Sequence, residues 1–189
     1  MMKKTLIAAS LTLIAGMANA AVTNGQLTFS WQGTTPAAPV VPGDFKFTDA
    51  TGTDWTPSNV SLNMTTSSDG SLSMNSANNM EFFISGSGST TALNSIKVYL
   101  GSNPVSTGFV GSKQLALATT AAPSNDQVAV LLNSQPLQVG SGNATTLNGV
   151  TGLQHQVSLS IAAKAASGSF TETTVVGFSV PVIFSVDLT

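Results

Sequence analysis

The chain has 189 residues, which suits one domain, and only 7% of them are charged. It contains six lysines, eight acidic residues, no arginine and no cysteine, which gives a formal net charge of −2. This composition excludes thiol catalysis and thiolate metal sites, and it argues against nucleic-acid binding, which needs clustered lysine and arginine side chains.

The first twenty residues have the three parts of a secretory signal peptide. Lys3 and Lys4 form a basic start, residues 6–14 form a short apolar run, and Ala18-Asn19-Ala20 is a small-residue cleavage motif. Because the apolar run is too short to span a bilayer, we expect residues 1–20 to be removed on export. The mature chain then has four lysines against eight acidic residues, a formal charge of about −4.

Residues 21–33 alternate strictly between two faces. Polar side chains occupy one face, and the other face carries Gly25, Leu27, Phe29, Trp31 and Gly33. This period of two predicts a half-buried strand. The next segment, residues 34–43, contains three prolines and predicts an extended linker, because proline cannot supply regular ladder hydrogen bonds. The pattern allows the strand to pair within its own chain or to reach a neighbour, and we favour a neighbour.

The remainder, residues 44–189, is expected to be one domain of short strands separated by turns. The expected strands cover residues 44–48, 60–65, 72–74, 80–84, 96–100, 115–117, 128–132, 137–139, 153–163 and 176–188. Asp69-Gly70 and Asn133-Ser134 are turn signals. No segment of the mature chain predicts a helix, and short strands with turns at intervals of roughly 8–12 residues predict an all-β sandwich.

Side chains that could carry catalysis or hold a metal ion are few. His155 is the single histidine and lies on the apolar face of its strand, which favours a core position. Asp44, Asp49 and Asp54 are spaced by five residues, which matches neither an EF-hand loop nor a carboxylate dyad, although a loop calcium site stays open. We therefore expect no enzyme activity, no cofactor and no metal site.

Two aromatic residues support an alternative function. Trp55 precedes Thr56-Pro57 and could stack on a sugar ring, although a tryptophan at a loop edge more often packs on the sandwich. Tyr99 points away from the apolar face of its strand. In this alternative the protein is a secreted monomeric sugar-binding β-sandwich, and residues 25–33 are its own first strand.

The last expected strand has an apolar face seven residues long. That face carries Val176, Phe178, Val180, Val182, Phe184, Val186 and Leu188. Such a strand is central in a complete sandwich, so a missing neighbour would leave an open groove with unpaired backbone groups. A segment such as residues 25–31 of another molecule could fill the groove by β-strand addition. Burying its three large apolar side chains would contribute roughly 5–9 kcal/mol.

Several stretches resemble one family of fimbrial pilins. Residues 21–33, Ala-Val-Thr-Asn-Gly-Gln-Leu-Thr-Phe-Ser-Trp-Gln-Gly, closely resemble the mature N-terminus of the major-subunit family of coli surface antigen 5 fimbriae. Residues 104–115, 128–139 and 180–188 are similar to the same family. The likeness is weak between about 43 and 95. The chain departs from many pilins in having no disulfide, and in ending on Leu188 and Thr189 without an aromatic residue beside the terminus.

The resemblance implies a chaperone–usher pilin, whose fold is an incomplete immunoglobulin-like β-sandwich lacking its last strand and completed by donor-strand exchange. It implies that residues 21–33 are a donor strand whose groove-filling residues are Gly25, Leu27, Phe29 and Trp31. It also implies that the acceptor groove, which first meets a periplasmic chaperone, is lined by Phe178, Val180, Val182, Phe184, Val186 and Leu188.

The implied function is that of a structural subunit of an adhesive fimbria on the cell surface, which attaches the bacterium to host cells. The implied partners are identical subunits in a homopolymer, the periplasmic chaperone, the outer-membrane usher and a minor tip subunit.

Overall fold

The computed structural model describes residues 22–31, 44–88 and 91–189. The predicted signal peptide and linker lie outside these residues. The described strands are β1 (Val22–Ser30), β2 (Phe45–Thr48), β3 (Leu62–Thr66), β4 (Leu72–Ser76), β5 (Met80–Gly86), β6 (Leu93–Leu100), β7 (Val105–Thr107), β8 (Ala116–Leu117), β9 (Gln127–Leu132), β10 (Gln135–Pro136), β11 (Thr145–Thr146), β12 (Gln154–Ala165) and β13 (Gly177–Leu188). Two single 3₁₀ turns, η1 (Val110–Ser112) and η2 (Ser141–Asn143), are the only helical elements of the described part.

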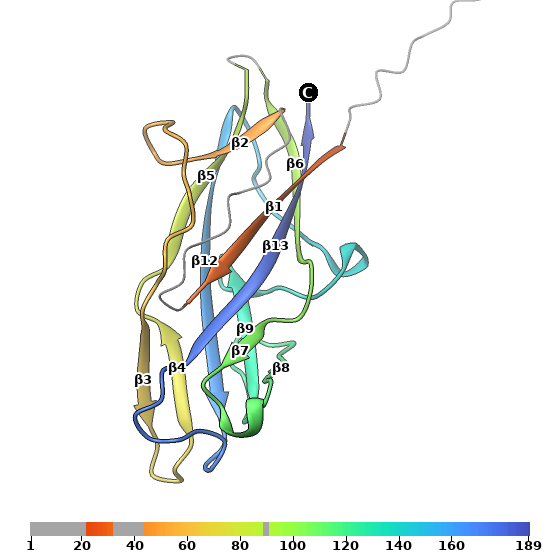
Figure 1. Cartoon of the computed structure of the whole chain (residues 1–189). Helices are drawn as coiled ribbons and strands as arrows, with labels where there is room; N and C mark the ends of the chain where they lie inside the picture. Colours follow the sequence, from red (N-terminus) through yellow and green to blue (C-terminus); the bar gives the residue numbers. More distant parts are fainter. Residues whose placement is uncertain (1–21, 32–43, 89–90) are drawn as a thin grey trace, which may run out of the picture.

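The strands form two sheets (Figure 1). Sheet A has the order β1-β13-β6-β11, with β7 also paired to β13. Sheet B has the order β10-β9-β12-β4-β3, with β5 paired to both β12 and β2, and β8 paired to β9. All pairings are antiparallel except the short β8–β9 pairing. The prediction of an all-β protein is confirmed.

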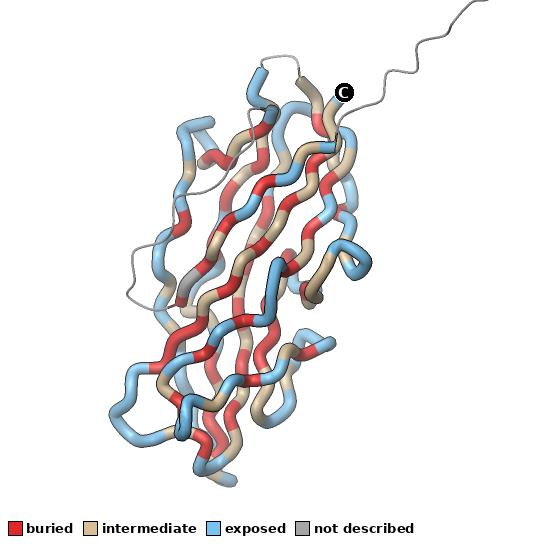
Figure 2. The backbone as a smooth tube through the Cα atoms, turned by 45° about the vertical axis from the view of Figure 1, so that its right-hand side comes forward, coloured by how far each residue is buried: buried red, intermediate tan, exposed pale blue. Residues whose placement is uncertain are grey.

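One hydrophobic core lies between the two sheets. Buried and less buried residues alternate along β12 and β13, which are each twelve residues long, because successive side chains of a strand point to opposite faces (Figure 2). The ring of Phe184 on sheet A lies 5.3 Å from that of Phe47 and 5.8 Å from that of Phe82, both on sheet B. These contacts join the inner faces of the sheets.

The predicted turns are present. Gly70 has a φ of 77° in the β3–β4 turn, where the Asp69 carboxylate accepts hydrogen bonds from the Ser71 backbone N–H (2.9 Å) and hydroxyl (2.7 Å). Asn133 and Ser134, between β9 and β10, have φ values of 48° and 68°. Positive φ at both central residues is the geometry of a two-residue type I′ hairpin turn.

Some strand expectations were wrong in detail. Met64 in β3 is 44% exposed, because β3 pairs with β4 alone at the edge of sheet B and its apolar alternation does not face the core. Leu153 is 48% exposed and precedes β12, which begins at Gln154. The pattern also did not predict β7 and β11, which are only three and two residues long. Within the described residues, no helix is long and apolar enough to cross a membrane.

Candidate functional site: the first strand and the groove along β13

The first strand pairs with the last strand along its whole length. Nine residues of β1 are in antiparallel register with β13, from Val22 opposite Asp187 to Ser30 opposite Ser179. The backbone N–H of Trp31 extends this ladder by donating to the Phe178 carbonyl oxygen at 2.8 Å. The first and last strands of the described chain are therefore joined in one continuous ladder.

The other edge of β13 is occupied by strands from the middle of the chain. Residues 182–188 pair with β6, and residues 177–179 pair with β7. Within the described part of the chain, β13 is the only strand that pairs with β1. Removal of β1 would therefore expose one complete edge of β13 and the apolar side chains beneath it.

The inner face of β1 is fully buried. The exposed fractions of Leu27, Phe29 and Trp31 are 0%, 0% and 1%, and Gly25 is also buried. In contrast, Val22 is 61% exposed, and Gln26 lies on the exposed outer face. In the register, Gly25 lies opposite Phe184, Leu27 opposite Val182, and Phe29 opposite Val180.

Phe29 connects this strand to an aromatic cluster of the body. Its ring centroid lies 6.0 Å from Phe82 of β5, 6.2 Å from Trp55 and 6.3 Å from Trp31. Phe82 in turn contacts Phe184 of β13. The strand therefore fills a space that residues from β5, β13 and the segment after β2 enclose together.

The predicted acceptor residues lie along β13, most of them at its buried positions. Val180, Val182, Phe184 and Val186 are 0% exposed, and Phe178 is 1% exposed. Leu188, at the end of the strand, is only partly buried. Both sets of residues therefore lie on the inner face of sheet A, on adjacent strands. In this single chain, the partner of β13 is the chain's own first strand.

The residues that pack against β1 from the opposite side of the core were not identified from the sequence. Phe82 of sheet B and Trp55 of the segment that follows β2 pack against Phe29 of β1, and Phe47 packs against Phe82. Their alternation could reveal that they face a core, but period-2 patterns do not tell which strand of the opposite sheet they meet.

The three aspartates considered for a calcium site have separate partners. Asp44 accepts a hydrogen bond from the Thr23 hydroxyl at 3.2 Å, and Asp54 lies 3.8 Å from the Lys46 ammonium group. Asp49 closes its own turn, and the hydroxyl of Thr51 is the main cause of its lowered pKa. The described residues contain no group of three or more His, Cys, Asp or Glu side chains that could share a metal ion.

His155 is half-buried in β12, opposite Ile84 of β5, and burial lowers its pKa. A second carboxylate network, in the loops of the body, centres on Asp126. It receives hydrogen bonds from the Ala166 backbone N–H (3.0 Å) and the Ser169 hydroxyl (2.8 Å), and it lies 2.7 Å from the Lys113 ammonium group. The bond from Lys113 is the main cause of its lowered pKa. This network ties loops of the body together.

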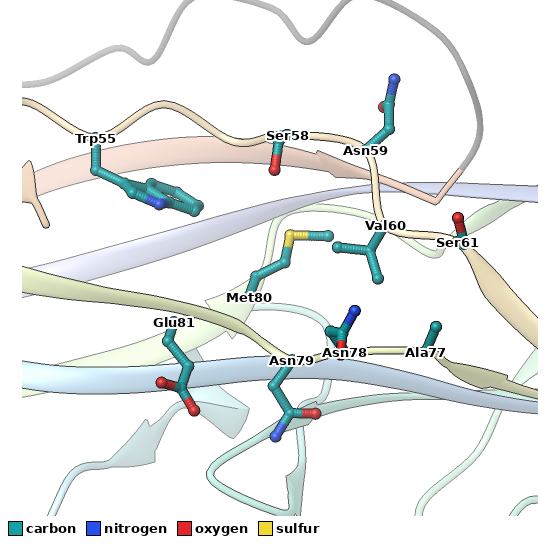
Figure 3. Close-up of a pocket in the computed structure, with 10 residues that line it drawn as sticks. All are labelled: Trp55, Ser58, Asn59, Val60, Ser61, Ala77, Asn78, Asn79, Met80 and Glu81. Atoms are coloured by element: carbon teal, nitrogen blue, oxygen red, sulfur yellow. The ribbon is translucent and has the colours of Figure 1, made fainter.

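Trp55 packs against the body. Its ring stacks on Phe82 with centroids 4.4 Å apart and planes 18° apart. A pocket of about 560 Å³ lies beside it, between residues 55–61 and 77–81, and the Met80 side chain points towards Val60 in this pocket (Figure 3). Tyr99 lies on β6 of sheet A, in register with Ile183. The two aromatic residues therefore do not form the shared sugar platform that the lectin alternative requires.

Comparison with known proteins assigns the family. No family model matches the chain, and no solved structure matches it. A CS5 fimbrial subunit of Escherichia coli is 37% identical over 203 residues, and the match covers 99% of this chain and 100% of the relative. This level of identity over both whole chains confirms the resemblance found in the sequence. The chain belongs to the CS5 fimbrial subunit family, and it is a structural subunit of a cell-surface fimbria rather than an enzyme.

Proposed function

We propose that this fimbrial subunit polymerises by donating β1 to the β13 groove of an identical neighbour. In this proposal residues 44–189 form an incomplete immunoglobulin-like sandwich, and the neighbour supplies its missing last strand. The observation that carries the proposal is the nine-residue register between β1 and β13, with Leu27, Phe29 and Trp31 fully buried.

Exchange between chains is possible because β1 is an outlying part of the domain. Twelve residues, 32–43, separate Trp31 from Asp44. The pairing partner of β1 is a single strand, so a second copy of β1 could form the same ladder and bury the same side chains. The apolar burial would contribute roughly 5–9 kcal/mol to each junction.

The direction of the strands predicts a linear polymer. The N-terminal end of β1 lies beside Asp187, and its other end lies beside Phe178. The body of the chain begins at Asp44, which the hydrogen bond from Thr23 places near the Asp187 end. A donated strand would leave the acceptor at the Phe178 end and continue into the Asp187 end of the donor. Such a head-to-tail contact is heterologous, and its repetition gives an open fibre when the rotation between subunits does not close a ring.

The open edge of β13 also accounts for the other proposed partners. Export through the periplasm requires protection of the open edge of β13, and a periplasmic chaperone that lends a strand would provide it. The outer-membrane usher would be the place where the incoming β1 replaces the chaperone strand. The assembled fimbria, with or without a minor tip subunit, would attach the bacterium to host cells.

The substitution Phe29→Asp tests this proposal. It places a charge in the aromatic cluster, where an unpaired charge is costly, so we expect fimbriae to be absent while the subunit still binds its chaperone. The matched control is Gln26→Asp, which puts the same charge on the exposed face of the same strand and should leave fimbriae at the normal level. Electron microscopy of surface fimbriae and copurification with the chaperone measure the two outcomes. Normal fimbriae from Phe29→Asp would contradict the proposal.

A further inference from the structure

We propose that successive subunits of the fimbria meet through a second contact, in which Leu153 of the donor subunit enters an apolar hollow on the body of the acceptor. The inference rests on the proposed donor-strand exchange and adds to it a contact between the bodies. Neither Leu153 nor the exposed residues of the hollow take part in the ladder between β1 and β13.

The apolar hollow lies where β1 ends. It has a volume of about 310 Å³, and it is lined by two polar residues and by Trp31, Val60, Leu62, Met64, Val175 and Val176. Met64 is 44% exposed and Val175 is 69% exposed, although both side chains are large and apolar. Because contiguous exposed apolar side chains mark surfaces that another molecule covers, the hollow is a candidate contact surface.

The hollow is continuous with the end of the strand ladder. Trp31 lines it, and the backbone N–H of Trp31 makes the last bond of the ladder, to the Phe178 carbonyl oxygen. The indole N–H of Trp31 is buried and has no hydrogen-bond partner in the described part of the chain. Since native structures pair nearly all buried polar groups, this unpaired donor marks an incomplete contact at the end of the ladder.

Leu153 projects from the opposite end of the body. It is 48% exposed and directly precedes β12. Its carbonyl oxygen accepts a hydrogen bond from the Gly86 N–H at 3.1 Å. The next residue, Ser87, donates its N–H to the Asp44 carbonyl oxygen at 3.0 Å. Leu153 therefore lies beside the point where the body of the chain begins.

The hollow and Leu153 are too far apart to meet within one chain. Met64 pairs with Met74 of β4, and Met74 pairs with Ala163 of β12. The path along β12 from Ala163 back to Leu153 is ten residue steps, which at 3.3–3.4 Å per step is about 33 Å. A contact between these two surfaces therefore requires two chains.

Donor-strand exchange brings the two surfaces together. The donated strand leaves the acceptor at Trp31, beside the hollow, and the body of the donor begins at Asp44, beside its Leu153. Entry of Leu153 into the hollow removes its side chain, and those of Met64 and Val175, from water. Because the two surfaces differ, the contact is heterologous and is repeated at every junction. It holds each body in a fixed orientation on the next, so the fimbria is stiffer than bodies joined by the strand alone.

Cysteine crosslinking of assembled fimbriae tests the contact. The protein has no cysteine, so an introduced pair gives a clean signal. The test variant is Met64→Cys with Leu153→Cys. The control is Thr65→Cys with Leu153→Cys, because successive side chains of β3 point to opposite faces. Gln26 and Ile183 lie opposite each other in the β1–β13 register, so fimbriae with Gln26→Cys and Ile183→Cys report on the donor strand itself. All fimbriae are oxidised, dissociated in denaturant and separated without reductant.

We expect a ladder of linked subunits from the test pair and subunits of monomer size from the control pair. A ladder from the Gln26 and Ile183 pair, with none from the test pair, would overturn the contact between bodies and leave donor-strand exchange intact. Equal ladders from the test and control pairs would overturn the assignment of the hollow. If none of the three pairs gives a ladder, both the contact and the donor strand are wrong.

Charge substitution provides a second measurement. Leu153→Lys and Val175→Asp each place a charge in the apolar contact, so we expect fimbriae that assemble but have a shorter persistence length in electron micrographs. Both side chains are exposed in the free subunit, so neither charge enters its core. The double variant pairs the two charges and should recover the stiffness. The control Val110→Asp, at a valine that is 50% exposed outside the hollow, should leave the persistence length unchanged. Unchanged stiffness of both single variants would overturn the contact.

Discussion

The two longest strands of this subunit are built alike but completed differently. β12 of sheet B has β9 on one side and β4 and β5 on the other, all from the body of the chain. β13 of sheet A has β6 and β7 on one side, but its other side is occupied by β1, which residues 32–43 separate in sequence from the other described strands. Both strands are twelve residues long and alternate in burial. Among the described strands, β13 is the one whose neighbour would come from another subunit in the proposed exchange.

On this proposal, the edge of β13 is where one subunit would be joined to the next. All the strands of sheet B come from residues 44–189, so its side of the core is built from the body of the chain alone. In the proposed exchange, a neighbour's strand would replace β1 in sheet A and leave the pairings of sheet B unchanged. Such a junction would need no disulfide, because the donated strand would be part of the fold of the acceptor subunit.

The largest expected effect is a loss of stability that an added peptide restores for a substitution in β1 of sheet A but not for one in β12 of sheet B. Leu159→Ala on β12 and Leu27→Ala on β1 both remove a fully buried side chain, and each should lower the free energy of unfolding by about 2–5 kcal/mol. An added peptide of residues 21–33 should restore the stability of Leu27→Ala, because it replaces the damaged strand. It should not restore that of Leu159→Ala. Urea unfolding with and without the peptide measures this, and equal rescue of both variants would remove the distinction between the sheets.

An intermediate effect is expected at Gly25. Gly25 is buried opposite Phe184 on the inward-facing side of β1, so the side chain of Gly25→Leu would enter a filled core. Overpacking of this kind costs about 1–3 kcal/mol. The control Asn24→Leu adds the same side chain at the neighbouring exposed position and should have little effect. Thermal unfolding of both variants checks the prediction, and equal melting temperatures would show that the groove has space at this position.

The smallest expected effect is the pH-dependent stability contributed by Asp126, which lies in the body of the chain outside β1. Asp126 has a lowered pKa, so its stabilising contribution is present above the ordinary value of 3.8 and is lost as the pH falls through the lower folded value. Its partner Lys113 is partly exposed, so we expect roughly 0.2–1 kcal/mol. The difference in unfolding free energy between the native chain and Asp126→Asn should therefore shrink between about pH 5 and about pH 2. If this difference in unfolding free energy stays constant over the range, ionisation of the Asp126 carboxylate is not its cause. Addition of the peptide of residues 21–33 should leave the difference unchanged.

The sequence predicted the parts of the fold that repeat a pattern for many residues. β1, β12 and β13 alternate over nine to twelve residues, so their faces and the buried positions of Leu27, Phe29 and Phe184 could be read directly. β7 and β11 could not, because two or three residues carry no period.

The contacts across the core could not be predicted for another reason. Alternation tells which side of a strand is buried, but the stacking of Trp55 on Phe82 depends on how the sheets face each other. The identity of the molecule that supplies β1 is also not in the pattern. The same alternating residues satisfy the chain's own groove and that of an identical neighbour equally well, because the two grooves are the same.

The most direct measurement is therefore made on assembled fimbriae. Cells would produce subunits with Gln26→Cys and Ile183→Cys, and intact fimbriae would be oxidised, dissociated in denaturant and separated without reductant. Donor-strand exchange predicts a ladder of covalently linked subunits, because the cysteine introduced at position 26 of each chain faces the cysteine introduced at position 183 of a different chain. A single band at monomer size, with the disulfide formed inside each chain, would show that β1 stays in its own groove in the fibre, and it would contradict the account.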